Sequence, residues 1–199
     1  MARPRANDFE DKKRSILASA AAVFAAQGME KASMAQIAQH AGVSKALLYH
    51  YYPSKEALIF AIIHTHLAAL DEALATADDA SLSPPLRLRR LIGVILEKYR
   101  GADDAHKVQL NALAALPPER RAEITAIERR IVQRVAAVLA TLHPPLAAPG
   151  RHLLTPVTMS LFGMLNWVYT WFRDDGPLSR EAYAEIVTRL MLEGVRAIG

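Results

Sequence analysis

One predicted helix face offers the clearest chemistry in this sequence. A cation, a small residue, a phenol and an imidazole occupy positions i, i+1, i+4 and i+5 of that helix, namely Lys45, Ala46, Tyr49 and His50. Residues at this spacing share one side of a helix, while the apolar side would contain Leu47, Leu48 and Tyr51. An exposed helix with this mixture of polar groups fits the major groove of DNA, where each base pair presents its own hydrogen-bonding pattern. The face therefore predicts contacts with DNA bases.

The residues around this helix carry the signals that would start and stop it and a partner helix. Ser33 and the glutamine three residues later form a capping-box pattern, which predicts a short helix through Ala41. Gly42 tolerates a positive φ, so it can end that helix and turn the chain sharply. Ser44 can then cap the second helix. Together these signals predict a helix-turn-helix within residues 33–58.

The wider pattern resembles the DNA-binding domain of TetR-type (tetracycline-repressor-like) transcriptional regulators. The resemblance rests on four blocks: Ala35-Gln36-Ile37-Ala38, Ala41-Gly42-Val43-Ser44, Leu48-Tyr49-His50-Tyr51-Tyr52 and Ser54-Lys55-Glu56-Ala57-Leu58. The preceding helix also fits, through Ile16-Leu17, Ala20, Val23-Phe24 and Gly28. A glycine between two short helices would by itself also fit an ordinary helical hairpin. The combination with the tyrosines, the proline and the downstream Ser-Lys pair favours the regulator.

The resemblance implies a role for each polar residue of this segment. Lys55 matches a family position that contacts a DNA phosphate, with help from the positive end of a helix. In the family, hydroxyl groups at four positions contact the DNA backbone or pack beside it. The residues at these positions are Ser33, Ser44, Tyr49 and Tyr51. The candidates for facing bases are Lys45, Ala46 and His50. Core packing is the alternative role for Tyr51 and Tyr52, and Arg3 and Arg5 would form either a DNA-touching arm or a solubilising tail.

The positive charge of the chain is concentrated in the same segment. Residues 1–55 contain eight Lys or Arg and four Asp or Glu, a net charge of +4 that equals the net charge of the whole chain. A basic patch attracts phosphates and releases counterions when DNA binds. A charged terminus that keeps the chain soluble is the alternative explanation, but its coincidence with the helix-turn-helix favours DNA binding.

Other functional classes find little support in the sequence. The absence of cysteine excludes a disulfide scaffold and a thiolate metal site, and it fits the reducing cytoplasm. We expect no enzyme and no cofactor, because the chain has neither a glycine-rich phosphate loop nor a Gly-x-Ser-x-Gly motif. His64 and His66 would point to different faces of a helix, so we expect no metal site. No segment resembles a signal peptide or a membrane span, so a cytoplasmic protein is expected.

The remainder of the chain predicts an all-α protein of about nine helices. We expect an N-terminal helix-turn-helix domain (residues 1–55) and a larger helical effector-binding and dimerisation domain (residues 56–199). The first helix is expected over residues 8–27, a connecting fourth helix over residues 55–77, and an apolar eighth helix over residues 154–173. The resemblance implies a homodimer built by the last two helices, an effector cavity, and a repressor of an inverted-repeat operator in double-stranded DNA. An architectural DNA binder without an effector is a remote alternative.

The predicted eighth helix suggests what the effector is. Its pattern Gly163-x-x-Asn166-Trp167-x-x-x-Trp171 resembles a TetR-type subgroup that answers to acyl-coenzyme A thioesters. The acyl part is expected in an apolar tunnel lined by Phe162, Leu165, Trp167 or Tyr169, and Asn166 offers a polar handle for the effector. The cations that could hold the phosphates are Arg100 and Arg173, with Arg87, Arg89, Arg90 and Lys107 as further candidates. Packing in the core or in the dimer is the alternative role of the helix residues, and an uncharged lipophilic compound is the alternative effector.

Overall fold

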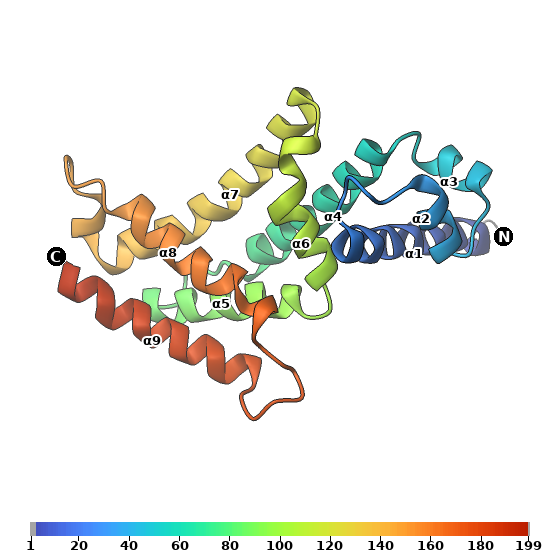
Figure 1. Ribbon diagram of the computed structural model, residues 1–199. Helices are drawn as coiled ribbons and strands as arrows, with labels where there is room; N and C mark the ends of the chain where they lie inside the picture. Colours follow the sequence, from blue (N-terminus) through green and yellow to red (C-terminus); the bar gives the residue numbers. More distant parts are fainter. Residues whose placement is uncertain (1–2, 199) are drawn as a thin grey trace. The chain divides into compact units, whose positions relative to one another are not determined.

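The computed structural model describes the backbone of residues 3–198 and the side chains from residue 9 onward. Within this range the chain forms nine α-helices and three short 3₁₀ turns, without a strand, as the sequence predicts (Figure 1). The helices are α1 (Arg3–Gln27), α2 (Met34–His40), α3 (Lys45–Tyr51), α4 (Lys55–Ala77), α5 (Pro84–Tyr99), α6 (Asp103–Ala112), α7 (Pro118–Leu142), α8 (Leu154–Asn166) and α9 (Arg180–Ile198). The 3₁₀ turns are η1 (Leu113–Ala115), η2 (Pro144–Ala147) and η3 (Val168–Thr170). The side chains of Arg3 and Arg5, the predicted arm, lie outside the described residues.

The helices form two compact units, and α4 and α7 contribute to both. The first unit comprises the chain up to Leu67 and residues 102–125, and the second comprises residues 68–101 and the chain from Ala126 onward. The first unit therefore contains α6 and the beginnings of α4 and α7 in addition to the three N-terminal helices. The functional division expected after residue 55 remains a prediction.

The first unit is built on α1, which contacts both α2 and α6. Side chains at helical spacing on α1, including Ile16, Ala20 and Phe24, are buried. They share a core with Ile37 of α2 and Leu48 of α3, which are fully enclosed. Two seven-residue helices are too short to be stable alone, so this shared core is what holds them in place.

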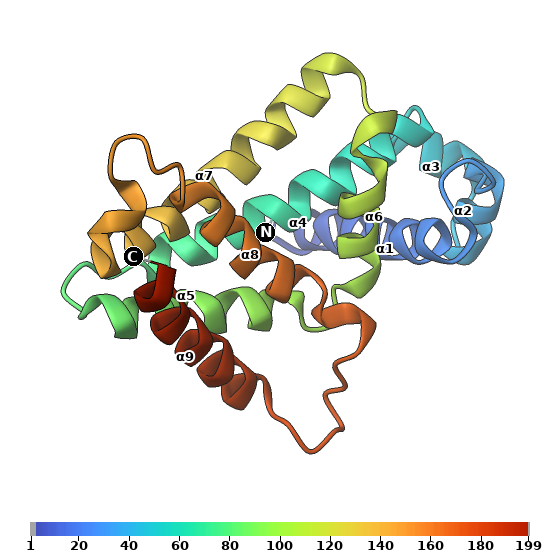
Figure 2. The same ribbon diagram turned by 60° about the vertical axis from the view of Figure 1, so that its left-hand side comes forward.

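The second unit is built on α5, α8 and α9, with α9 lying beside α5 (Figure 2). Its core contains Leu88 and Ile95 of α5, Leu161 and Leu165 of α8, and Val187 of α9, all of them fully buried. These apolar residues follow helical spacing on each element, so one face of every helix is removed from water.

A network of ion pairs joins α4, α5 and α7 inside the second unit. Asp71 accepts a 2.8 Å hydrogen bond from Arg130, and Asp78 accepts a 3.1 Å bond from Arg134 and a 2.5 Å bond from Arg87. The hydrogen bond from Arg87 is the main reason that the pKa of Asp78 lies below its usual value. Because both aspartates are largely shielded from solvent, these contacts fix the end of α4 against its neighbours more firmly than exposed pairs would.

Two predicted helix boundaries were wrong. The first helix begins at Arg3 rather than at residue 8, because Pro4 is tolerated in a first turn, where its missing N–H has no helical partner. The eighth helix ends at Asn166 rather than at residue 173. Beyond it the backbone tightens into η3, and the Thr170 hydroxyl donates a 2.7 Å hydrogen bond to the Trp167 carbonyl. The β-branched and aromatic residues 167–172 are weak helix formers, so this local alternative prevails.

The helix α4 has the length and mean hydropathy of a helix that could cross a membrane, the one such helix among the described residues. Many of its apolar side chains are nevertheless buried against protein, among them Leu58, Ile59 and Ile63 in the first unit and Leu70 and Leu74 in the second. The hydropathy of α4 is therefore explained by its position in two protein cores.

We expect the stability of the first unit to depend on pH through the ring pair His66 and His106. His106 of α6 is buried, and its ring centroid lies 5.7 Å from that of His66 on α4. Burial, with a smaller contribution from the neighbouring His106, lowers the pKa of His66 from 6.5 to about 4. Between these two pH values the unfolded chain binds a proton that the folded chain does not, so stability falls as the pH falls through this window.

We expect the free energy of unfolding to decrease by about 2 kcal/mol between pH 7 and pH 5 through His66 alone. Urea denaturation at pH 7 and pH 5 measures this loss. The His66→Leu variant should lose less unfolding free energy between the two pH values than the wild type, because the contribution of His66 is absent. The exposed His40 provides the control, because the His40→Leu variant should show the same pH dependence of stability as the wild type. An unchanged pH dependence in His66→Leu would contradict the assignment.

Candidate nucleic-acid interface and effector region

The start of α2 has the capping box that the sequence predicts. The Gln36 amide donates a 3.2 Å hydrogen bond to the Ser33 hydroxyl oxygen, and the Ser33 amide donates a 2.9 Å bond to the Gln36 side-chain oxygen. Two backbone N–H groups that the helix leaves without partners are thereby satisfied. Ser33 is exposed but its hydroxyl already has a structural role.

The turn between α2 and α3 depends on a glycine and a second serine cap. Gly42 has φ +62°, in the left-handed region that favours glycine. The Val43 amide donates a 3.0 Å hydrogen bond to the Ala38 carbonyl, which closes the end of α2. The Leu47 amide then donates a 3.1 Å bond to the Ser44 hydroxyl oxygen at the start of α3. The predicted helix-turn-helix is therefore present with its predicted caps.

The helix α3 presents the predicted face to solvent. All four candidates on that face are exposed: Lys45, Ala46, Tyr49 and His50. On the opposite side Leu48 is fully buried, while Leu47 and Tyr51 are half-buried. Tyr49 is 49% exposed. A cation, a phenol and an imidazole are thus displayed together on a helix that the core holds in place.

The two tyrosines that follow have different environments. Tyr52 is buried, and this burial is the main reason that the pKa of its phenol lies above the usual value. Core packing therefore describes Tyr52 well. Tyr51 is half-buried, and its ring lies 5.1 Å from that of Phe9 on α1 and 5.7 Å from that of His50. Tyr51 thus links the exposed face of α3 to the beginning of α1.

Lys55 makes contacts that the sequence did not predict. It is the first residue of α4, whose start is capped by a 3.2 Å hydrogen bond from the Ala57 amide to the Ser54 hydroxyl oxygen. The Lys55 ammonium donates to the carbonyl oxygens of Glu30 and Ala32, both at 3.3 Å. Nothing in the spacing of these residues signals the contact, because it joins segments more than twenty positions apart.

The structure divides the predicted effector residues between the core and the surface. Phe162 and Leu165 of α8 are buried, whereas Trp167 is 61% exposed and Tyr169 is half-buried. Asn166 accepts a 2.8 Å hydrogen bond from the Tyr99 hydroxyl of α5. Burial raises the pKa of Tyr99, so its phenol stays protonated and can donate this bond. Because α8 ends at Asn166, Trp167 and Trp171 do not share a helix face as their spacing suggested.

Every cation considered for the effector phosphates already has a carboxylate within 4.0 Å. Arg173 pairs with Asp175 at 3.1 Å, and Arg100 pairs with Glu97 at 3.1 Å. The other four pairs are Arg87 with Asp78, Arg89 with Glu185, Arg90 with Asp79 and Lys107 with Asp104. An anionic ligand would therefore have to compete with a carboxylate at each of these positions.

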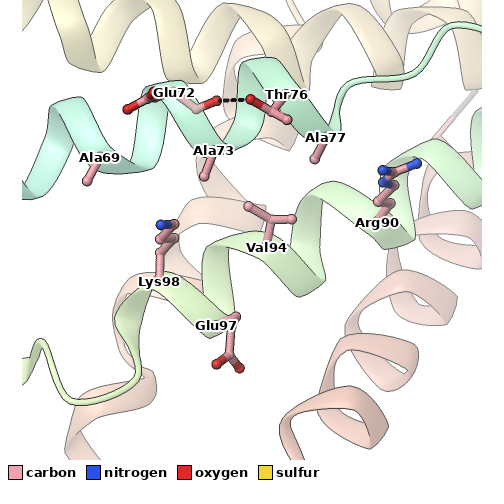
Figure 3. Close-up of a pocket in the computed structure, with 9 residues that line it drawn as sticks. All are labelled: Ala69, Glu72, Ala73, Thr76, Ala77, Arg90, Val94, Glu97 and Lys98. Atoms are coloured by element: carbon pink, nitrogen blue, oxygen red, sulfur yellow. Dashed lines mark hydrogen bonds between the residues drawn. The ribbon is translucent and has the colours of Figure 1, made fainter.

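A pocket of about 580 Å³ lies between α4 and α5 in the second unit (Figure 3). Small residues of α4 form one wall, and the charged side chains at the pocket are Glu72, Arg90, Glu97 and Lys98. Two acids and two bases leave this lining without net charge, which gives no selectivity for a polyanion. Among the residues predicted to bind the effector, Arg90 lines this pocket, whereas Arg100, Arg173 and the five predicted residues from Phe162 to Tyr169 do not.

Large apolar side chains are exposed on the last two helices and on the segment between them. Leu190 of α9 is 58% exposed, Ile186 lies one turn before it, and Met159 of α8 is also exposed. Trp171 packs edge-on against Tyr183 of α9, with ring centroids 5.1 Å apart, and half of its indole remains exposed. Large exposed apolar side chains on neighbouring elements are candidates for a surface that another protein covers.

Comparisons with known proteins agree with this architecture. The family model described as "Bacterial regulatory proteins, tetR family" matches residues 16–62, and the model "Tetracyclin repressor-like, C-terminal domain" matches residues 81–195. A TetR-family transcriptional regulator from Bordetella parapertussis 12822 shares 37% sequence identity, over 90% of this chain and 93% of that one, with a TM-score of 0.84.

Two further relatives carry more informative names. AibR, solved in complex with isovaleryl coenzyme A and operator DNA, shares 29% identity over 91% of this chain and 98% of that one, with a TM-score of 0.76. The HTH-type transcriptional regulator RutR of Escherichia coli (strain K12) is 31% identical over 65% of this chain. The aligned part spans 60% of RutR, which is less than two thirds of its length.

Proposed function

The chain belongs to the TetR family of transcriptional regulators, and from this premise we propose that it represses a promoter by binding an inverted-repeat operator as a homodimer. The observation that carries the proposal is the exposed face of α3, where Lys45, Tyr49 and His50 stand on a capped helix anchored by Leu48. Its donors and acceptors suit base edges in the major groove. In this proposal the hydroxyls of Ser33, Ser44, Tyr49 and Tyr51 lie beside the DNA backbone, and Ala46 faces a base.

The proposed dimer forms through α8 and α9. A dimeric regulator must place its two reading helices in successive major grooves. The helices are then about 34–36 Å apart, or slightly more. The exposed Met159, Ile186 and Leu190 supply an apolar surface on these two helices. A second copy of the chain would remove this surface from water, which favours association. In this proposal the protein acts in the cytoplasm, the compartment that contains its operator DNA.

The proposed effector is an acyl-coenzyme A thioester that lowers the affinity for DNA. Support comes from the Gly163 to Trp171 pattern and from AibR, whose structure holds isovaleryl coenzyme A. In this proposal the acyl part lies against Phe162, Leu165, Trp167 or Tyr169, and Asn166 provides a polar contact. Arg100 and Arg173 exchange their carboxylate partners for phosphate. Because α4 belongs to both compact units, the signal would pass along it. An uncharged lipophilic compound is the second candidate, since the lining of the α4–α5 pocket carries no net charge.

We expect Lys45→Ala and His50→Ala to change which base is preferred at individual operator positions. Each substitution should weaken binding to the preferred operator by about 1–3 kcal/mol, because a contact with a base edge disappears. Binding to a library of randomised operators would measure the preference. Lys98→Ala, which removes a cation from the second unit, serves as the control and should leave the preference intact. An unchanged base preference in both α3 variants would rule out base reading by this face.

Replacing Leu190 by glutamate should dissociate the proposed dimer, since a charge would be buried in an apolar interface. Sedimentation velocity at micromolar concentration should then show a monomer, and operator affinity should fall with it. The matched control is Leu110→Glu, at an exposed leucine of α6, which should leave the dimer intact. A Leu190→Glu variant that sediments like the wild type would place the interface elsewhere.

Only the thioester should release DNA if the effector is an acyl-coenzyme A. A coupling of roughly 1–3 kcal/mol would weaken operator binding about 5- to 150-fold at saturation. Fluorescence anisotropy with labelled operator can compare the thioester with an equimolar mixture of the free acid and coenzyme A. Arg173→Gln and Arg100→Gln should require more thioester for the same release. Release by the free acid at equal potency would instead favour a lipophilic effector that needs no phosphate.

A further inference from the structure

We propose that Lys55 is a positioning residue for the DNA-reading helices, in addition to the phosphate contact that the resemblance implies for it. Its ammonium fastens the start of α4 to the loop that leads into α2, and it does so in the protein without DNA. The importance of this tether for operator binding rests on the proposed function. The tether itself belongs to the free protein and can be tested without DNA.

The geometry places the Lys55 ammonium beside the beginning of α2. The two carbonyls that it contacts, those of Glu30 and Ala32, lie in the loop between α1 and α2 at 3.3 Å each. Ala32 is buried and immediately precedes Ser33, the residue that caps α2. A single side chain therefore connects the first residue of α4 to the residue before the cap of α2. The start of α2 is thus fixed in two ways: by the capping box and by the contacts of Lys55 with the preceding loop.

The electrostatics of the helix end explain why these carbonyls matter. The first turn of a helix carries a partial positive charge, which disfavours a lysine at that position. Two carbonyl oxygens offset this effect because they direct partial negative charge at the ammonium. Glu56, also in the first turn of α4, has a lowered pKa, chiefly through a backbone hydrogen bond and a bond from Ser54, and so adds a negative charge nearby. The cation is thus stabilised where the helix alone would repel it.

The number of donors on the ammonium makes the two roles compatible. A lysine ammonium has three N–H donors and no acceptor. Two of them are directed to the carbonyls of Glu30 and Ala32, so one remains for a phosphate oxygen. A phosphate would then meet a side chain whose orientation is already fixed relative to α2. Contacts to phosphates set the register of a protein on DNA, and here the register would be transmitted to α2 and, through its packing, to α3.

Hydrogen exchange of the DNA-free protein tests the tether directly. In Lys55→Met, which keeps the aliphatic stem, amides of the α1–α2 loop and the first turn of α2 should exchange roughly three- to tenfold faster than in the wild type. Lys31→Met, at an exposed lysine of the same loop, removes the same charge and should not change the exchange. Amides of α9 report whether the variant is folded.

A measurement on the wild type keeps the proposal testable if Lys55→Met does not fold. In ¹⁵N-resolved NMR spectra, the ammonium hydrogens of Lys55 should exchange with water more slowly than those of Lys31, because two of them are held by carbonyls. Equal exchange of the two ammonium groups would overturn the tether. Equal amide exchange in a folded Lys55→Met variant would overturn it as well.

Binding to operator DNA at several salt concentrations separates the tether from the phosphate contact. Lys55→Met should reduce the slope of log affinity against log salt by about one if the third donor meets a phosphate. A reduced slope with unchanged amide exchange would leave Lys55 as a phosphate ligand only and overturn the positioning role. Faster exchange with an unchanged slope would support the tether and contradict the phosphate contact that the resemblance implies for Lys55.

Discussion

The helix-turn-helix of this protein depends on satisfying the backbone N–H groups at the starts of its helices. The helices α2 and α3 have seven residues each, too few to be stable in isolation. Ser33, Ser44 and Ser54 each accept a hydrogen bond from an amide three residues ahead, so three successive helices begin at serine caps. With these caps in place, a few buried side chains such as Leu48 suffice to hold the exposed face of α3 in one orientation.

The same local character explains why this region could be predicted from the sequence. A capping box, a glycine with positive φ and a helix face are defined by residues within one or two turns of each other, and each is found where the sequence placed it. The contact of Lys55 with the Glu30 and Ala32 carbonyls has no such local signature. It depends on how α4 and the α1–α2 loop come together, which no spacing within either segment encodes.

The effector region shows the corresponding limits. The apolar character of residues 154–173 predicts one continuous helix, because hydrophobicity is the dominant signal in this segment. In the structure the weak helix propensity of its second half decides the outcome, and α8 ends at Asn166. The bond between Asn166 and Tyr99 likewise joins two distant helix ends. An amide that appeared free to meet a ligand therefore has a partner within the protein, and the polar groups of this region form a largely self-satisfied set.

The early end of α8 has an optical consequence. Trp167 and Trp171 are the two tryptophans of the entire chain, and both lie in the irregular segment after this helix, 61% and 49% exposed to solvent. The emission of the protein on excitation of its tryptophans consequently originates from this segment alone. A change in the solvent exposure or order of the junction between α8 and α9 should therefore alter the tryptophan emission, without a label and without a contribution from the helix-turn-helix.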